Sequence, residues 1–71
     1  MTKKLTLHLK GRDNWDRPVY ENNGTLYVDV DPRKASGPDI HTKCANDFYG
    51  EPNTPIPTDC IVEFIPHRDT W

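Results

Sequence analysis

Residues 18–30 read PVYENNGTLYVDV, and the pattern of this stretch decides the fold. Two runs rich in β-branched and aromatic residues flank an Asn-Gly pair at positions 23 and 24. Asn-Gly readily adopts the two positive φ angles of a type I′ turn, the shortest common connection between antiparallel strands. The stretch therefore predicts a β-hairpin in which Tyr20 lies opposite Tyr27, with both rings on one face of the sheet.

Three further segments have the patterns of β-strands. Residues 5–10 alternate strictly, with leucine at every second position, which is typical of a strand with one buried face. Residues 40–44 can alternate in the same way, with Cys44 on the inner face. Residues 60–65 carry apolar side chains at both parities, so we expect a central strand whose two faces are both covered.

The connections between these strands are polar or rich in proline. Asp31-Pro32 ends the hairpin, because proline cannot donate a hydrogen bond to a β-ladder. Residues 33–38 have the composition of a loop. Residues 46–59 contain several prolines, which excludes a helix and predicts a long loop with at most a short turn at residues 45–49. Such a loop either covers one face of the sheet or carries the function.

The predicted fold class is all-β. No amphipathic helix can be drawn anywhere along the chain, and the patterns amount to about five short strands. We expect a small antiparallel sheet or a partly closed barrel, rich in loops. With 71 residues, of which 34% are hydrophobic, the chain 1–71 is expected to form a single small domain with a thin core.

The charge balance argues against several classes of partner. Nine lysines and arginines against eleven aspartates and glutamates give a formal net charge of -2. This balance offers no electrostatic reason to expect nucleic acid or an anionic membrane as the partner. The chain has no long apolar run, and its first residues lead into an alternating strand pattern rather than a signal peptide. We expect an aqueous, cytoplasmic setting.

The two cysteines, Cys44 and Cys60, are too few for a disulfide framework, although the sequence leaves a single bridge open. We favour two buried, free side chains that pack as small hydrophobes. Together with His41 and His67 they could form the ligand set of a zinc site. Positions 41 and 44 of a regular strand point to opposite faces, however, so no metal site is predicted.

Three aspartates lie at and after the end of the predicted hairpin. Asp29, Asp31 and Asp39 offer hard oxygen ligands for calcium, but their spacing fits no calcium-binding loop. We expect them to form a solvated strand edge instead, where charge discourages aggregation between edges.

The residue types that carry catalysis are scarce. The single serine, Ser36, lies in a polar loop without a nucleophile-elbow motif, and both cysteines lie in apolar strand patterns. The chain has no glycine-rich phosphate loop. We therefore expect neither an enzyme nor a bound cofactor.

The motif Arg-Asp-x-Trp occurs twice, at residues 12–15 after the first strand and at residues 68–71 after the last. The two copies could form two equivalent recognition corners. Alternatively, they reflect a shared structural need, in which the aspartate caps a turn and the tryptophan covers a sheet edge. We favour the second explanation, because such short matches do not indicate a duplication.

A surface of aromatic and arginine side chains is the remaining functional candidate. Arg12, Trp15, Tyr20, Tyr27 and Trp71 have the composition typical of protein-interaction hot spots. The same rings could instead cover the second face of a small sheet. Stacking on single-stranded nucleic acid would also use them, but it requires a basic groove, and the lysines and arginines are scattered.

Four segments carry a resemblance to known proteins: GRDNWDRPVY at residues 11–20, LYVDVDPR at 26–33, GEPNTP at 50–55 and RDTW at 68–71. Together they resemble a group of short, uncharacterised proteins carried by mobile elements, conjugative elements or phages, of Gram-positive gut bacteria. The resemblance spans most of the chain. It implies a bacterial cytosolic accessory protein and brings no activity or functional residue with it.

These observations predict a small protein-binding module that acts through the five aromatic and arginine residues. A modulator or inhibitor of a host or mobile-element protein would fit this description. The alternative is a nucleic-acid-binding accessory factor of a mobile element. The two differ in their response to salt, because binding driven by phosphate contacts weakens steeply as the salt concentration rises.

Overall fold

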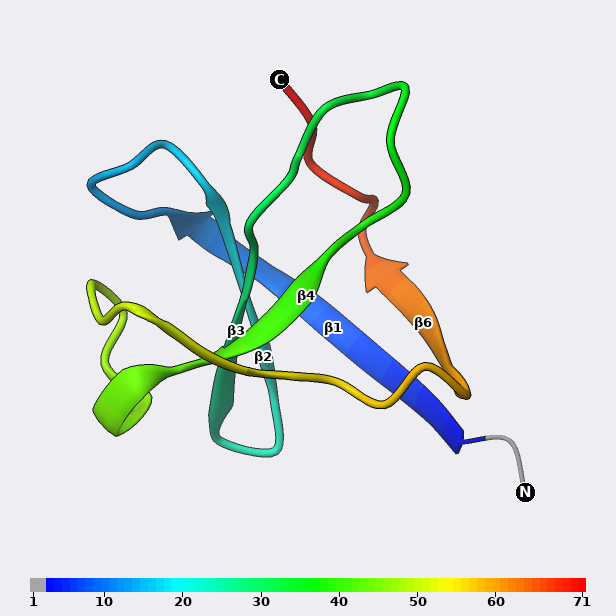
Figure 1. Ribbon diagram of the computed structural model, residues 1–71, viewed down its shortest axis with the longest axis horizontal. Helices are drawn as coiled ribbons and strands as arrows, with labels where there is room; N and C mark the ends of the chain where they lie inside the picture. Colours follow the sequence, from blue (N-terminus) through cyan, green and yellow to red (C-terminus); the bar gives the residue numbers. More distant parts are fainter. Residues whose placement is uncertain (1–2) are drawn as a thin grey trace.

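Six strands form one mixed sheet in the computed structural model, which describes residues 3–71 (Figure 1). Their order across the sheet is β5-β4-β3-β2-β1-β6, and all neighbours are antiparallel except β1 and β6, which are parallel. The strands are β1 (Lys3–Arg12), β2 (Pro18–Asn22), β3 (Thr25–Asp29), β4 (Ile40–Lys43), β5 (Pro52–Pro55) and β6 (Cys60–Ile65). The all-β prediction is confirmed, with one strand more than expected and one parallel pair.

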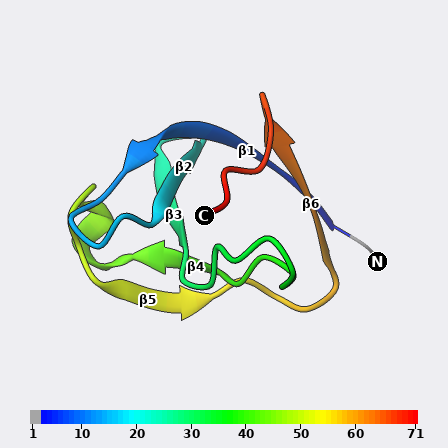
Figure 2. The same ribbon diagram turned by 90° about the horizontal axis from the view of Figure 1, so that it is seen from above.

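The sheet curves strongly, so that the strands wrap around the C-terminal segment (Figure 2). β5 and β6 are the two edges and do not pair with each other, so the barrel is not closed. The chain between them, residues 56–59, spans the seam instead of a hydrogen-bonded ladder. No helix formed by the described residues is long and apolar enough to cross a membrane.

The central hairpin forms in the predicted register. β2 and β3 pair with Tyr20 opposite Tyr27. Asn23 and Gly24 have φ angles of 50° and 81°, the two positive values that a type I′ turn requires. Local turn chemistry and strand alternation are therefore sufficient to specify this part of the fold.

The hydrophobic core lies on the face that carries the leucines of β1 and the two tyrosines of the hairpin. Leu7 and Tyr20 are fully buried, and Ile40 is nearly so. The Phe64 ring packs on Tyr20 with their centroids 5.0 Å apart. Around this cluster lie the partly buried residues Leu5, Leu9, Tyr27, Ile56, Val62 and Phe64. The tyrosines thus enlarge a core that has few aliphatic side chains.

The prediction that the last strand is central is wrong. β6 lies at an edge, paired only with β1, and its burial alternates along the strand. Ile61 and Ile65 point outward and are 58% and 39% exposed. Its apolar residues at both parities therefore do not reflect cover on both faces. The β2–β3 hairpin does have buried residues on both faces, because Val19 and Val28 are fully buried on the face that does not carry the tyrosines.

The cysteines are free, as favoured, but the prediction that both are buried is wrong. Cys44 is exposed and Cys60 is half-buried. β4 ends at Lys43, and the chain then enters a short 3-10 turn, Cys44–Asn46, in which Ala45 has a φ of 56°. This turn takes Cys44 out of the strand alternation, and the buried side chain at the end of β4 is that of Lys43.

The proline-rich segment contributes more structure than predicted. Pro52–Pro55 forms β5 against β4, and Ile56 then packs into the core while its backbone N–H donates to the Ile40 carbonyl at 3.1 Å. Asn46, the first residue of this segment, accepts a hydrogen bond from the Leu26 N–H at 2.7 Å. The polar segment at residues 33–38 is a loop, as predicted.

Candidate binding surface

The turn between β1 and β2 is built around the carboxylate of Asp13. Its Oδ1 accepts hydrogen bonds from the backbone N–H groups of Trp15 and Arg17, at 2.9 and 3.1 Å. These bonds close the turn in the way expected of an aspartate beside a strand end. Asp16 reverses the chain with a φ of 60°. The Asp13 side chain thus fixes the turn together with two backbone hydrogen bonds, from the Asp13 N–H to the Arg17 carbonyl and from the Asp16 N–H to the Asp13 carbonyl, and the turn carries Trp15.

The other carboxylate oxygen of Asp13 joins a buried ion cluster. Oδ2 lies 2.9 Å from Lys43 Nζ and 3.0 Å from Arg17 Nη2. The side chains of Asp13 and Lys43 are 1% and 0% exposed. Burial alone would raise the pKa of Asp13, but the hydrogen bonds from Lys43 and Arg17 outweigh it and hold that pKa below its ordinary value.

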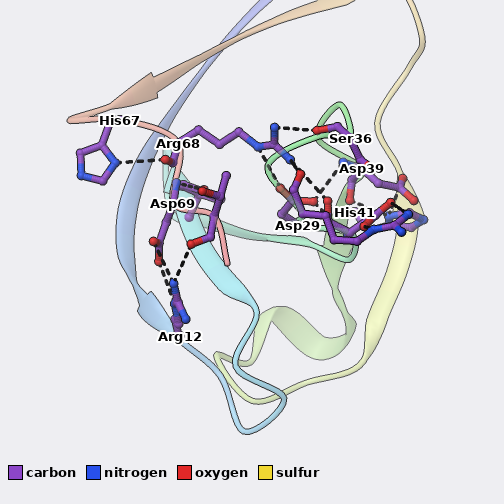
Figure 3. A network of polar contacts seen from close by, with 12 residues as sticks. Arg12, Asp29, Ser36, Asp39, His41, His67, Arg68 and Asp69 are labelled. Carbon is purple, nitrogen blue, oxygen red and sulfur yellow. Dashed lines mark hydrogen bonds and ion pairs between the residues drawn. The ribbon is translucent and has the colours of Figure 1, made fainter.

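The C-terminal segment is tied to this turn through Arg12 (Figure 3). The Arg12 guanidinium donates two hydrogen bonds to the Asp69 carboxylate, from Nε at 2.9 Å and from Nη2 at 3.0 Å. It also donates to Asp16 Oδ2 at 3.1 Å and to the Thr70 carbonyl at 3.1 Å. The bonds from Arg12 lower the pKa of Asp69, and those from Asp69 and Asp16 raise the pKa of Arg12.

The C-terminal Trp71 therefore docks on the turn that carries Trp15. Trp71 donates from its indole Nε1 to the Asp16 carbonyl at 2.7 Å, and its backbone N–H donates to the Pro32 carbonyl at 3.0 Å. Trp15, the residue before Asp16, has the Arg17 guanidinium 5.8 Å from its ring centroid. Trp15 is 67% exposed and Trp71 is 58% exposed. We call Arg12, Trp15, Asp16 and Trp71 the tryptophan surface.

The two Arg-Asp-x-Trp motifs meet, but they do not form equivalent corners. Arg12 from the first motif binds Asp69 from the second. Arg68 instead reaches into the loop after β3 and donates to the carbonyls of Ser36 and Arg33, at 2.7 and 3.2 Å. Only Asp13 caps a turn, as the structural explanation of the motif expected; Asp69 is an ion-pair partner.

The prediction that the three aspartates form a solvated strand edge is wrong for Asp29. This residue is fully buried, and its Oδ1 accepts hydrogen bonds from the backbone N–H groups of Asp31 and Asp39, at 3.1 and 3.0 Å. Its Oδ2 lies 3.5 Å from Arg68 Nε. Asp29 thus organises the loop after β3, because it satisfies backbone donors that the loop cannot pair within a ladder.

Tyr20 does not belong to any surface, contrary to the sequence prediction. The side chain is fully buried in the core, where burial raises its pKa, and its hydroxyl accepts a hydrogen bond from the Asp69 N–H at 3.0 Å. Tyr27 is half-buried against the same core. The hydrophobic effect favours these rings inside, because the core has too few aliphatic side chains to fill it. Arg12 and Trp71 both hydrogen-bond to Asp16, the residue after Trp15.

The four candidate zinc ligands do not assemble. Within residues 3–71, no group of three or more histidine, cysteine, aspartate or glutamate side chains has an arrangement that could hold a metal ion. His41 lies beside Asp39, with Nδ1 3.4 Å from Oδ1. His67 lies in the C-terminal segment, where its Nδ1 is 3.1 Å from the Arg68 carbonyl.

Asp16, Arg17 and Asp69 are the residues of this region that the sequence analysis did not single out. The repeated motif was the available signal, because it places an arginine next to an aspartate at two positions far apart in the chain, so that the arginine of one copy can pair with the aspartate of the other. No family model, curated protein or solved structure matches the chain.

Proposed function

We propose that this chain is a small protein-binding module that contacts a protein partner through the tryptophan surface. The observation that carries the proposal is the exposure of Trp15, 67%, on the turn between β1 and β2, together with that of Trp71, 58%, whose indole is hydrogen-bonded to the same turn. An exposed indole leaves a large apolar area in water, and tryptophan and arginine are enriched at the centres of protein interfaces. A modulator of a bacterial host or mobile-element protein is the corresponding biological role.

The anchoring of the two rings supports recognition rather than incidental exposure. Trp71 is held by two hydrogen bonds, one of them from its indole, and Trp15 lies within the turn that Asp13 closes, with the Arg17 guanidinium beside its ring. Side chains that are already fixed lose less conformational entropy when a partner binds. Arg12 joins them with three ion-pair and hydrogen-bond partners, so its own position is fixed as well.

The distribution of charge favours a protein partner over nucleic acid. Among the described residues, every lysine and arginine except Lys3 and Lys34 has a carboxylate oxygen within 4.0 Å. Phosphate binding would have to compete with these ion pairs, and it gains most from clustered, unpaired cations. We therefore propose binding to a protein surface with apolar and hydrogen-bonding groups.

Capture from bacterial lysate, carried out with and without nuclease treatment, tests the proposal. The immobilised chain is compared with the double variant Trp15→Ala/Trp71→Ala and with the matched control Tyr49→Ala. Tyr49 is 61% exposed and belongs to no part of the tryptophan surface. We expect a protein that is retained by the native chain and by the control, is lost from the double variant, and stays bound as salt rises to about 0.5 M.

Circular dichroism must show that all three chains fold alike. Binding that survives loss of both indoles would contradict the tryptophan surface. Binding that disappears with nuclease or at about 0.2 M salt would support the nucleic-acid alternative instead.

A further inference from the structure

The two edges of the sheet differ in how they are protected. β5 is four residues long, begins and ends with proline, and exposes the polar Asn53 and Thr54. Short edges with prolines resist pairing with another chain. β6 is six residues long, contains no proline and is rich in β-branched residues. Only β1 pairs with it among the described residues, so its other side offers unpaired backbone groups.

Apolar surface accompanies this free edge on both faces. On the outer face, Ile61 and Ile65 are 58% and 39% exposed. On the inner face, Cys60 and Val62 line a hollow of about 410 Å³ at the seam of the sheet, with Ile40 on the opposite side. The volume suits one or two apolar side chains of a bound segment. An added strand would alternate between these two apolar regions.

The charged residues of β6 and of the position just before it are acidic. Glu63 lies between the two exposed isoleucines on the outer face, and Asp59 immediately precedes the strand. Asp39 lines the hollow. Lys4 is the one cation paired with Glu63, at 3.2 Å, and it lies on the β1 side. A partner segment with basic side chains therefore complements the edge.

The same glutamate disfavours pairing between two copies of this chain. If two β6 strands paired antiparallel with Ile61 opposite Ile65, the Glu63 side chains of the two copies would lie directly opposite each other. Like charges in this position destabilise an antiparallel pair. Glu63 thus disfavours this pairing between two copies and favours a partner strand that has a basic residue opposite it.

We propose that the free edge of β6 binds an extended segment of a partner protein by strand addition, with basic residues opposite Glu63 and Asp59 and an apolar residue in the seam hollow. Backbone hydrogen bonds supply affinity in this mode, and the alternating side chains supply specificity. The inference is independent of the tryptophan surface and stands if that surface binds nothing.

A synthetic peptide tests the proposal directly. The probe is acetyl-Val-Leu-Lys-Leu-Val-Thr-Lys-amide, which places lysines opposite Glu63 and Asp59 when it pairs antiparallel with β6. The comparison peptide has glutamate at both lysine positions. Amide chemical shifts of the isotope-labelled full chain are followed during each titration. We expect perturbations centred on Cys60–Ile65 with the lysine peptide and binding about tenfold weaker with the glutamate peptide.

Three variants complete the test. Glu63→Lys should abolish the preference between the two peptides, because Asp59 still favours the lysine peptide, and Ile61→Thr should weaken binding of both. Asn53→Lys, which adds the same charge to the β5 edge, should leave binding unchanged. All three sites are on the surface, and unchanged shift dispersion confirms folding.

Equal binding of the two peptides, shifts centred on β5, or no shifts at all would overturn the proposal. A dimer in sedimentation experiments, with β6 amides that broaden as the protein concentration rises, would also overturn it, because the occupant would then be a second copy.

Discussion

Removing the charge of Asp13 tests how strongly the buried cluster supports the turn that carries Trp15. In Asp13→Asn, the amide can still accept the bonds from the Trp15 and Arg17 backbone, but Lys43 remains fully buried without its carboxylate. Breaking a buried ion pair by removing one partner costs about 3–5 kcal/mol. A domain of this size has roughly 4–11 kcal/mol of stability in total, so the loss is a large fraction of it.

Urea denaturation followed by circular dichroism measures this loss. The variants are Asp13→Asn, Lys43→Met and the double variant. Lys43→Met replaces the buried ammonium with an apolar side chain and leaves Asp13 paired with Arg17 at 3.0 Å, so we expect a change within about 1 kcal/mol. The double variant should recover about 2 kcal/mol relative to Asp13→Asn, because the fully buried Lys43 ammonium is no longer left without its carboxylate.

Asp59→Asn serves as the matched control, because this aspartate is exposed and has no hydrogen-bond or ion-pair partner within the described part of the chain. It should change the free energy of unfolding by no more than about 0.5 kcal/mol. The reasoning is refuted if Asp13→Asn loses less than about 1 kcal/mol, or if the double variant is no more stable than Asp13→Asn.

Two further predictions concern stability. The pKa values of Asp69 and Asp13 are lowered on folding from 3.8, so both carboxylates stabilise the fold above that pH, and the free energy of unfolding should fall as pH drops through the lowered values. Arg12→Gln should weaken this dependence of stability on pH and raise the pKa of Asp69 measured by NMR titration. An unchanged pKa of Asp69 would show that Arg12 does not hold the C-terminal segment. Gly24→Ala should cost about 1–2 kcal/mol in urea denaturation because its φ is 81°, whereas Gly37→Ala, with open space around it, should be nearly neutral; equal effects would contradict the assigned turn.

The repeated motif shows where sequence reasoning about the site succeeded and where it stopped. An arginine, an aspartate and a tryptophan after each of two strands indicated related local needs, and the structure joins the copies through Arg12 and Asp69. The sequence could not show that the first arginine would select the second aspartate, because these residues are 57 positions apart. Such pairing depends on where β1 and β6 end relative to each other.

Tyr20 and Lys43 mark the limit most clearly. The sequence left open whether Tyr20 lies in the core or on the surface, and a lysine in a polar pattern suggests exposure by residue type. Tyr20 is fully buried because the curvature of the sheet brings Phe64 and Leu7 around it. Lys43 is buried because Asp13, which is 30 positions away, supplies its counter-charge.

By itself, the sequence determined the features that depend on neighbouring residues: the all-β class, the type I′ hairpin with its register, and the alternation of β1. Backbone angles and side-chain periodicity act within a few residues, so they can be read along the chain. Only the tertiary structure decided that β6 is an edge parallel to β1, that Tyr20 fills the core, and that the C-terminal segment docks beside Trp15. These outcomes depend on long-range packing and ion pairs, whose free energy exists only once the sheet has brought distant segments together.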